Sequence, residues 1–311
     1  MAAELRAGGP LPRLLVLGGA VLWGTTGTTQ ALGAPAADPG TVGALRLAVG
    51  AISLVVLAVV AGRGRSLAGL ARPGARLAAL VGAAAIAAYQ VLFFEGVART
   101  GVAVGTIVGI GSAPVFTGLV ELVVRRVRPE RVWAISTALA VTGCVLLAAS
   151  GGEETVVDPL GIVLALGAGA SYAVFTVATK HLLDRGCGPF ETMAGTFGAG
   201  TVVLLPLFAG GDFAWAASGR GLLAVLWLGV ATVGVGYALY ATGLRSLPAA
   251  SVATLTLGEP LTAGLLGWLV LGERLEPLGS AGVVAVVAGL AVLALRPGQP
   301  RAGVTARRGS D

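Results

Sequence analysis

One carboxylate lies in the middle of a long apolar stretch of this sequence. Glu259 falls within residues 250–271, where a carboxylate inside a bilayer would cost about 3 kcal/mol. Pro260 follows it and cannot donate to the carbonyl oxygen of Thr256, so we expect that carbonyl to be free. A carboxylate, a hydroxyl and a free carbonyl together suit a cation, a proton or a substrate amine. The alternative is that Glu259 is protonated or hydrogen-bonded and only braces the proline kink.

Aromatic and hydrogen-bonding side chains share single faces of two apolar segments. Trp23, Thr26 and Gln30 are spaced i, i+3 and i+7, which would place a flat ring above two polar groups. Tyr172, Thr176 and Lys180 share one face of a later segment. Such faces could line a common cavity, although threonines in membrane helices also bond to carbonyls of their own helix. Three more cavity candidates lie deep in their segments: Tyr89, Gln90 and Tyr237.

Two further positions are expected to shape the fold around these groups. Arg46 lies about six residues into the apolar segment 41–61. Its side chain could extend to the membrane surface, pair with an acidic residue or meet a substrate carboxylate. Pro114 would free the carbonyl of Ile110 as Pro260 does for Thr256, but Ala113 stands where Glu259 does. The two proline segments are therefore chemically unequal.

These residues belong to a sequence that repeats itself at an offset of 146 residues. Residues 96–119 read GVARTGVAVGTIVGIGSAPVFTGL, and residues 242–265 read TGLRSLPAASVATLTLGEPLTAGL. Pro114 corresponds to Pro260 in this alignment. Duplication of an apolar unit is common in secondary transporters, in which the substrate site lies near mid-membrane between the two copies.

The composition is that of a membrane protein. The chain of 311 residues is 56% hydrophobic and 12% charged, with a mean hydropathy of +0.89. A soluble domain cannot hide so much apolar surface, because polar groups must cover its exterior. The 50 glycines suit close helix packing in lipid. Gly101, Gly105 and Gly109, at every fourth position, are expected to provide such a packing face.

Ten apolar stretches approach the length of about 20 residues that crosses a bilayer. They cover residues 14–33, 41–61, 76–95, 101–124, 132–150, 159–179, 191–210, 221–243, 250–271 and 278–295. The sequence therefore predicts an all-α polytopic protein of ten transmembrane helices. Residues 14–150 and 159–296 would each form a five-helix repeat, and residues 297–311 a disordered cytoplasmic tail. Because five is odd, the second repeat would be inverted relative to the first.

The basic residues predict the orientation. With the amino terminus inside the cell, 17 basic residues fall on the cytoplasmic side and only Arg99, Arg220 and Arg274 outside. This positive-inside asymmetry places both termini in the cytoplasm and the protein in the plasma (inner) membrane. The arginines are dispersed along one membrane face, so the high isoelectric point does not indicate nucleic-acid binding.

Chemistry other than transport finds little support in the sequence. His181 has no cluster of cysteines or carboxylates with metal-ligand spacing around it, and the phosphate-binding pattern GxxxxGK[ST] is missing. We therefore expect no catalytic residues, no metal, no cofactor and a driving force from a gradient of protons or substrate. The expected partners are a small-molecule substrate and the lipid bilayer, and a homodimer is left open. The rival classes are a flippase of lipid-linked intermediates and a membrane-embedded enzyme.

Several short motifs follow one another in a defined order along the chain, and the proline-containing one occurs in each half. They are Leu22-Trp23-Gly24, Ala44-Leu45-Arg46-Leu47, Ser112-Ala113-Pro114-Val115, Gly258-Glu259-Pro260-Leu261 and Leu271-Gly272-Glu273. In their order, spacing and duplication they resemble the EamA-type branch of the drug/metabolite transporter superfamily. The resemblance covers almost the whole chain. It implies ten helices in two inverted repeats and transport, often export, of amino acids, metabolites or amphipathic drugs. It also favours a fold-stabilising pair for Arg46. The first half departs from the pattern, because Arg126-Val127 stands where the second half has Gly272-Glu273.

Overall fold

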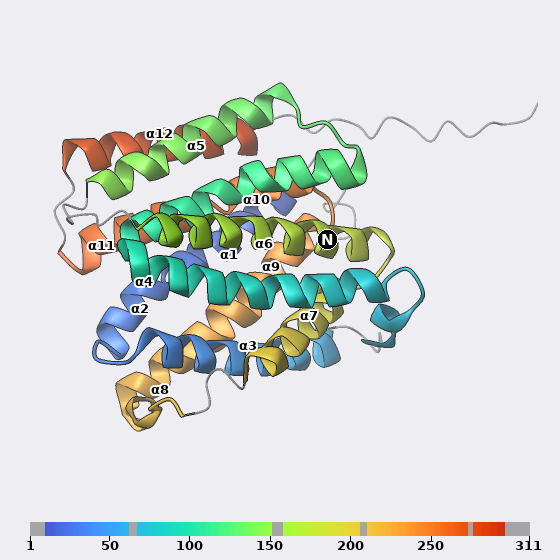
Figure 1. The fold of residues 1–311 in the computed structure, drawn as a ribbon, viewed down its shortest axis with the longest axis horizontal. Helices are drawn as coiled ribbons and strands as arrows, with labels where there is room; N and C mark the ends of the chain where they lie inside the picture. Colours follow the sequence, from blue (N-terminus) through green and yellow to red (C-terminus); the bar gives the residue numbers. More distant parts are fainter. Residues whose placement is uncertain (1–9, 62–66, 151–157, 206–209, 273–275, 296–311) are drawn as a thin grey trace, which may run out of the picture.

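The computed structural model describes residues 10–61, 67–150, 158–205, 210–272 and 276–295, which fold into helices without a β-strand (Figure 1). The α-helices are α1 (Leu11–Gly24), α2 (Thr26–Gly33), α3 (Pro39–Ala61), α4 (Arg76–Val120), α5 (Arg131–Ala149), α6 (Pro159–Asp184), α7 (Pro189–Leu204), α8 (Gly219–Leu226), α9 (Gly236–Leu244), α10 (Ala249–Leu255), α11 (Gly258–Val270) and α12 (Pro277–Ala294). The 3-10 helices η1 (Leu67–Ala71) and η4 (Ala214–Ala217) lie in connections. The π-helical segments η2 (Glu121–Arg125) and η5 (Trp227–Val235) continue α4 and α8.

Local sequence explains where several helices begin. Pro159, Pro189 and Pro277 occupy the first turns of α6, α7 and α12, where a missing N–H costs nothing and the fixed φ suits a helix. The Asp158 side chain also accepts the Leu160 N–H at 2.9 Å, which caps α6. Within lipid, a helix forms the hydrogen bonds of all its interior backbone N–H and C=O groups. These apolar stretches are therefore expected to be helical.

Eight helical segments are long and apolar enough to cross a membrane: Gly40–Val60, Arg76–Gly101, Val104–Arg125, Arg131–Ala149, Pro159–Asp184, Gly219–Leu244, Ala249–Leu271 and Pro277–Ala294. Each coincides with a predicted span, which confirms the all-α, multi-pass class. Large apolar side chains on these helices point outward, including Val60 at 75% exposure and Val123 at 75%. An apolar exterior of this kind suits contact with lipid tails.

The other two predicted spans take a different form in the described residues. The span expected at 14–33 is divided into α1 and α2 at Thr25, whose side chain donates to the Leu22 carbonyl oxygen at 2.6 Å. The span expected at 191–210 corresponds to α7, of 16 residues, and residues 206–209 lie outside the described chain. The predicted tail 297–311 lies outside it as well.

The boundary between the third and fourth spans differs from the prediction. The helix continues past residue 95 to Thr100, and the chain then reverses at Gly101, which has a left-handed φ of 80°. Glycine adopts this backbone without the clash that a Cβ would cause. Gly101 is therefore the turn of a helical hairpin, and its predicted role on a packing face is wrong. Gly105 does pack closely, since a Cβ there would lie 2.7 Å from the Cα of Val97.

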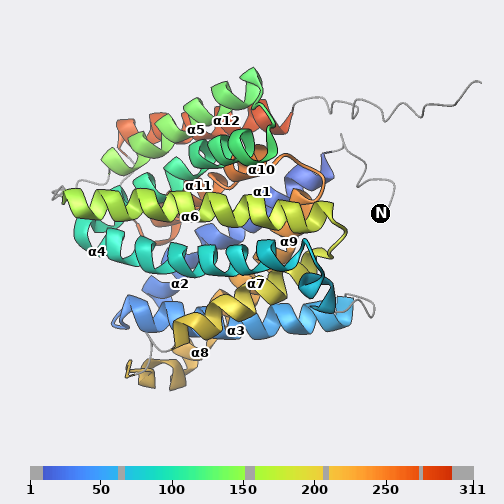
Figure 2. The ribbon, with the colours of Figure 1, turned by 45° about the vertical axis from the view of Figure 1, so that its right-hand side comes forward.

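Most helices run across Figure 1, so the molecule has two opposite ends that correspond to the two faces of a membrane. Figures 1 and 2 show α5 beside α12 at one edge, α3 and α8 at the other, and α4 with α6 between them. Behind these, α1 packs against α9. We call the end at which α4 begins the arginine-rich face, because Arg72, Arg76, Arg125, Arg131 and Arg185 lie at helix ends there.

Candidate substrate site

A cluster of aromatic rings occupies the middle of the bundle. The Tyr237 ring of α9 lies 4.3 Å from the ring of Phe197 in α7 and 4.5 Å from that of Trp23 in α1. Phe175 of α6 stacks on Tyr240 at 6.3 Å between ring centroids. These contacts join helices from the two sequence halves through large, rigid side chains.

Hydrogen bonds fix the orientation of two members of this cluster. Trp23 Nε1 donates to the Thr232 carbonyl oxygen at 2.9 Å, and Trp23 is 3% exposed. The Thr176 hydroxyl and the Tyr240 hydroxyl are 2.8 Å apart and both residues are fully buried. Trp23, Thr176 and Tyr237 were predicted to bind substrate. In this conformation they pack within the aromatic cluster and are not among the residues that line the small cavity beside it.

The central cavity lies beside the aromatic cluster and is lined by Tyr89, Ile110, Ala113, Tyr172, Thr256 and Glu259. Four of these six residues were predicted to bind substrate. The cavity has a volume of about 10 Å³, which is room for about one water molecule. A substrate as large as an amino acid can enter only if the surrounding helices move apart.

Glu259 stands at a break in the ninth span. α10 ends at Leu255 and α11 begins at Gly258, so Glu259 lies in the first turn of α11. The positive end of the helix dipole favours a carboxylate there. The Thr256 carbonyl is not free as predicted, because the Glu259 N–H donates to it at 2.9 Å. A helix that restarts after the break supplies the donor that the proline lacks.

Arg46 faces the same region as Glu259 from α3. The guanidinium of Arg46 interacts electrostatically with Glu259, and Tyr89 and Tyr237 are within range of both charges. The ion pairs of the described residues do not include Arg46, and its buried Nε has no hydrogen-bond partner among them. The stabilising pair predicted for Arg46 is therefore not observed in this part of the chain. Glu259 therefore lines the cavity with an opposite charge, Arg46, in electrostatic range, and the two do not form a closed ion pair.

The Leu22-Trp23-Gly24 motif has a structural explanation. A Cβ on Gly24 would lie 2.7 Å from the Glu259 carbonyl oxygen and 2.5 Å from the Thr262 Cβ. Glycine at this position lets α1 approach the first turn of α11. Trp23 beside it anchors α1 to η5, so the motif positions the backbone of Glu259.

The remaining predicted positions are scattered. Thr26 lies just beyond the break at Thr25, and its hydroxyl is buried without a partner among the described residues. Gln30 is partly buried on α2. Gln90 lines a separate small cavity between α3, α4 and α7. Pro114 is buried inside α4, where the flanking backbone stays helical.

A second polar cluster, at the arginine-rich face, was not predicted. Glu121, at the end of the fourth span, accepts the N–H groups of Ala249 and Ala250 at 3.1 and 2.8 Å and lies 3.6 Å from Arg125. Lys180 of α6 donates to the carbonyl oxygens of Leu244 and Arg245, both at 3.0 Å. We call these contacts the α9–α10 clamp, because they hold both ends of the turn between those helices.

Asp184 completes the α9–α10 clamp. It lies 3.0 Å from Lys180 and also pairs with Arg125. Lys180 was expected on the cavity face with Tyr172 and Thr176, but the clamp occupies it instead. The sequence offered one signal for Glu121, which is a carboxylate at the end of an apolar span.

The fold and these two clusters define a multi-pass helical membrane protein with a polar site buried between its halves. The chain belongs to the EamA-like transporter family, whose model matches residues 11–149 and 159–295. This confirms the resemblance found in the sequence and makes the protein a membrane transporter. Members and relatives are named transporters or exporters, in agreement with the prediction that the chain is not an enzyme.

Three relatives illustrate the range of named activities. The uncharacterized transporter YwfM of Bacillus subtilis is 40% identical over 289 residues, 93% of this chain and 95% of its own. A probable terminal-alkyne amino-acid exporter of Streptantibioticus cattleyicolor is 31% identical, over 78% of this chain and 80% of its own. The threonine/homoserine exporter RhtA of Salmonella typhimurium is 32% identical over 188 residues, 58% of this chain and 60% of its own.

The fold itself has a solved counterpart. A crystal structure superposes with a TM-score of 0.77 over 91% of this chain and 96% of the other, at 19% sequence identity. At that identity the match supports the architecture alone.

Proposed function

We propose that this protein exports amino acids, or metabolites and drugs with the same pair of charges, across the plasma membrane as a secondary transporter. The observation that carries the proposal is that Glu259 lines the closed central cavity, while Arg46 lies within electrostatic range of its carboxylate and forms no ion pair with it. A zwitterion presents a carboxylate to Arg46 and an ammonium group to Glu259, and each charge-assisted bond replaces lost hydration. Two relatives with amino-acid exporter names support this substrate class.

The proposed mechanism is alternating access between two inverted five-helix repeats, with ten transmembrane helices in all. The packing of the helices supports this mechanism. In the first half, α4 packs against α6 of the second half. In the second half, α9 is equivalent to part of α4, and it packs against α1 of the first half. Likewise α3 packs on α7 and α5 on α12, which are equivalent spans of the two halves. Interchanging the halves thus preserves each pair, as an inverted repeat requires.

Glu259 is the proposed proton-coupling residue. Its carboxylate can bind either a proton or the substrate ammonium, and competition between them would couple export to the proton gradient. In the observed conformation the central cavity is too small for substrate, so this structure corresponds to a closed state of the cycle.

Transport by the reconstituted protein tests the substrate class. Uptake of radiolabelled L-threonine into proteoliposomes is compared with uptake of 1-amino-2-propanol, which is threonine without its carboxylate. Arg46→Gln should raise the KM for L-threonine about 10- to 100-fold through the loss of a charged hydrogen bond. The KM for 1-amino-2-propanol should stay nearly unchanged. Arg131→Gln, on an exposed residue of α5, is the matched control. Equal effects of Arg46→Gln on both compounds would contradict the proposal.

The proposed orientation places the arginine-rich face and both termini in the cytoplasm. In a chain without Cys144 and Cys187, an impermeant thiol reagent applied to intact cells should label Thr155→Cys. It should label Ala68→Cys only after permeabilisation. The reverse pattern would overturn the orientation. The bilayer and a small-molecule substrate are the proposed partners, nucleic acid is not, and cross-linking in the same membranes would detect a homodimer.

A further inference from the structure

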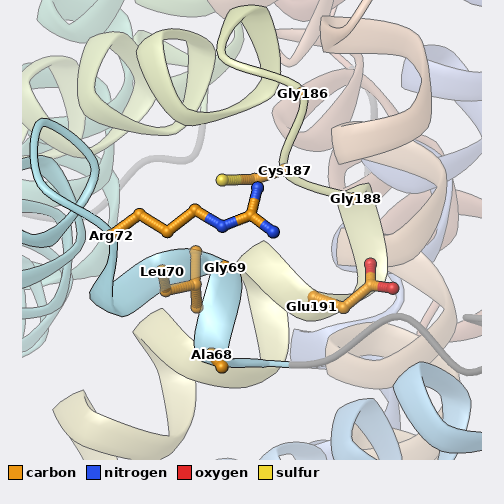
Figure 3. A pocket seen from close by; sticks show the side chains of 8 residues that line it. All are labelled: Ala68, Gly69, Leu70, Arg72, Gly186, Cys187, Gly188 and Glu191. Atoms are coloured by element: carbon orange, nitrogen blue, oxygen red, sulfur yellow. The ribbon is translucent and has the colours of Figure 1, made fainter.

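A second pocket opens at the arginine-rich face, away from the central cavity. It has a volume of about 320 Å³ and lies between η1, the turn at residues 186–188 and the first turn of α7 (Figure 3). Arg72, Cys187 and Glu191 supply its chemically active side chains. In contrast to the central cavity, this pocket has room for an amino acid in the observed conformation.

Glu191 is an unusual group on the wall of this pocket. The residue is 3% exposed, and neither carboxylate oxygen has a hydrogen-bond partner among the described residues. A buried carboxylate normally has a compensating partner, because desolvation without one is costly. Glu191 lies in the first turn of α7, at the positive end of the helix dipole. Gly188 permits the arrangement, since any Cβ there would overlap the Glu191 carboxylate.

Arg72 supplies the opposite charge. It is exposed at the rim, and Figure 3 shows its side chain reaching across the pocket toward Cys187. No ion pair joins Arg72 to Glu191 among the described ion pairs. One pocket therefore presents a buried negative group and a separate positive group, neither of which neutralises the other.

We propose that this pocket is a loading site that binds a free amino acid before it enters the central cavity. Both Glu191 carboxylate oxygens are covered in the observed conformation, so the ammonium group would bind them after the side chain rotates into the pocket, and the ligand carboxylate would bind the Arg72 guanidinium. The inference rests on the proposed function, because it gives the exported substrate a first binding site at the cytoplasmic face. Like the region around Glu259, the pocket combines a carboxylate with an arginine, and its volume of about 320 Å³ is about 30 times that of the central cavity, about 10 Å³.

Cys187 provides a direct measurement of occupancy. It lines the pocket and is partly buried, and Cys144→Ala, on α5 and remote from the pocket, leaves it as the chain's single thiol. Burial raises the pKa of the Cys187 thiol, although Arg72 opposes this. Alkylation by N-ethylmaleimide should therefore be followed at pH about 8.5, where more thiolate is present. L-Threonine in the pocket should slow the reaction in purified protein.

Three comparisons test the binding mode. Glu191→Gln and Arg72→Gln should each raise the L-threonine concentration for half-protection about 10- to 100-fold, through the loss of a charged hydrogen bond. Propylamine and propionate, which carry one charge each, should protect only at similarly raised concentrations. Where Glu191→Gln lowers the amount of protein in the membrane, Arg72→Gln at the exposed rim gives the same test.

Two outcomes would overturn the loading site. One is an alkylation rate that L-threonine does not change up to its solubility limit. The other is equal protection of the parent and both variants. Protection is measured without transport, so it separates this inference from the proposed function. If Glu259→Gln abolishes proton-driven accumulation and Cys187 remains protected, the two sites are distinct. If the protein transports L-threonine without protecting Cys187, only the loading site fails.

Discussion

The two proline-containing spans each carry one carboxylate, and the two carboxylates have opposite surroundings. Glu121 lies seven residues after Pro114, is 2% exposed, accepts two backbone N–H groups and pairs with Arg125. Glu259 directly precedes Pro260, and no side-chain hydrogen bond or ion pair joins it to the described residues. A carboxylate with all its partners in place stabilises a helix packing, whereas one that lacks them is available to a ligand or a proton.

The two prolines also have different helical surroundings. Pro114 lies within the unbroken helical part of α4 that follows Gly101, whereas Pro260 stands in the first turn of α11 after a break in the span. The two matched halves thus differ, because the second has a helix break with a charged group beside the central cavity. The following tests are arranged from the largest expected effect to the smallest.

The largest effect should come from Glu259→Gln. The substitution keeps the size and most hydrogen bonding of the side chain but removes its titration. Proton-driven accumulation of substrate should be lost, while exchange of labelled for unlabelled substrate across the membrane remains. Counterflow and pH-jump uptake in proteoliposomes measure the two processes. Unchanged accumulation with unchanged pH dependence would make Glu259 a brace for the helix break.

A transferred carboxylate sharpens the same comparison. Ala113 is the sequence equivalent of Glu259 and lines the same cavity, so Ala113→Glu is combined with Glu259→Ala. We expect no recovery of accumulation, because Ala113 lies within a continuous helix and lacks the positive helix end beside Glu259. Recovery would show that a carboxylate anywhere in the cavity suffices.

Glu121→Ala should mainly affect stability. The change leaves the N–H groups of Ala249 and Ala250 without their acceptors and removes a partner of Arg125. Unfolding should become easier by roughly 3 kcal/mol, measured as a lower midpoint of thermal aggregation in detergent. Glu95→Ala, at an exposed carboxylate near the opposite face, is the matched control. Similar losses in both variants would show that the clamp adds nothing.

Gly24→Ala tests the contact between α1 and the first turn of α11. The added Cβ would overlap the Glu259 carbonyl and Thr262, and overpacking of this kind costs about 2 kcal/mol. Transport should fall along with thermal stability. Gly27→Ala is the control, because no atom lies within 4 Å of a Cβ at that position. Equal behaviour of the two variants would exclude a close helix contact.

The smallest effect should come from Arg99→Gln at the face opposite the clamp. Arg99 lies 3.5 Å from Asp158 and 3.9 Å from Glu95, but its side chain is 43% exposed. Exposed ion pairs of this kind contribute about 0–1 kcal/mol. A double-mutant cycle with Asp158→Asn measures the coupling. A coupling as large as that expected for Glu121 would remove the contrast between the two faces.

The sequence was sufficient for the class of fold and for most span positions. The length of the apolar stretches and the internal repeat are properties of the local sequence, so they can be recognised without knowledge of tertiary contacts. The break at Thr25 was missed, because it sits in sequence that is typical of a continuous helix. The turn at Gly101 was placed a few residues too early, between the predicted spans 76–95 and 101–124. Glu95 was the last residue of the predicted span 76–95 and Arg99 fell in the connection after it, although their spacing of four residues suits the helical end that both occupy.

The candidate site was predictable in part. Tyr89, Tyr172, Thr256 and Glu259 were identified from type and depth, and they meet at one cavity. Phe175 and Phe197 were missed, since an aromatic residue in an apolar span carries no signal of where its ring points. The prediction that the Thr256 carbonyl is free was wrong, because the restart of the helix at Gly258 depends on tertiary packing. Glu191 was overlooked, as its lack of partners appears only when neighbouring helices are placed.

The α9–α10 clamp has a kinetic consequence. Its turn is held by Glu121 from the first half and Lys180 from the second, so in the proposed cycle a movement of this turn away from α4 and α6 would separate both contacts at once. Salt screens such buried charges weakly and exposed pairs such as Arg99–Asp158 strongly. Ionic strength should therefore change the opening rate at one end of the molecule and leave the other nearly constant. A transport cycle limited by the clamped end would run at the same speed in dilute and concentrated salt.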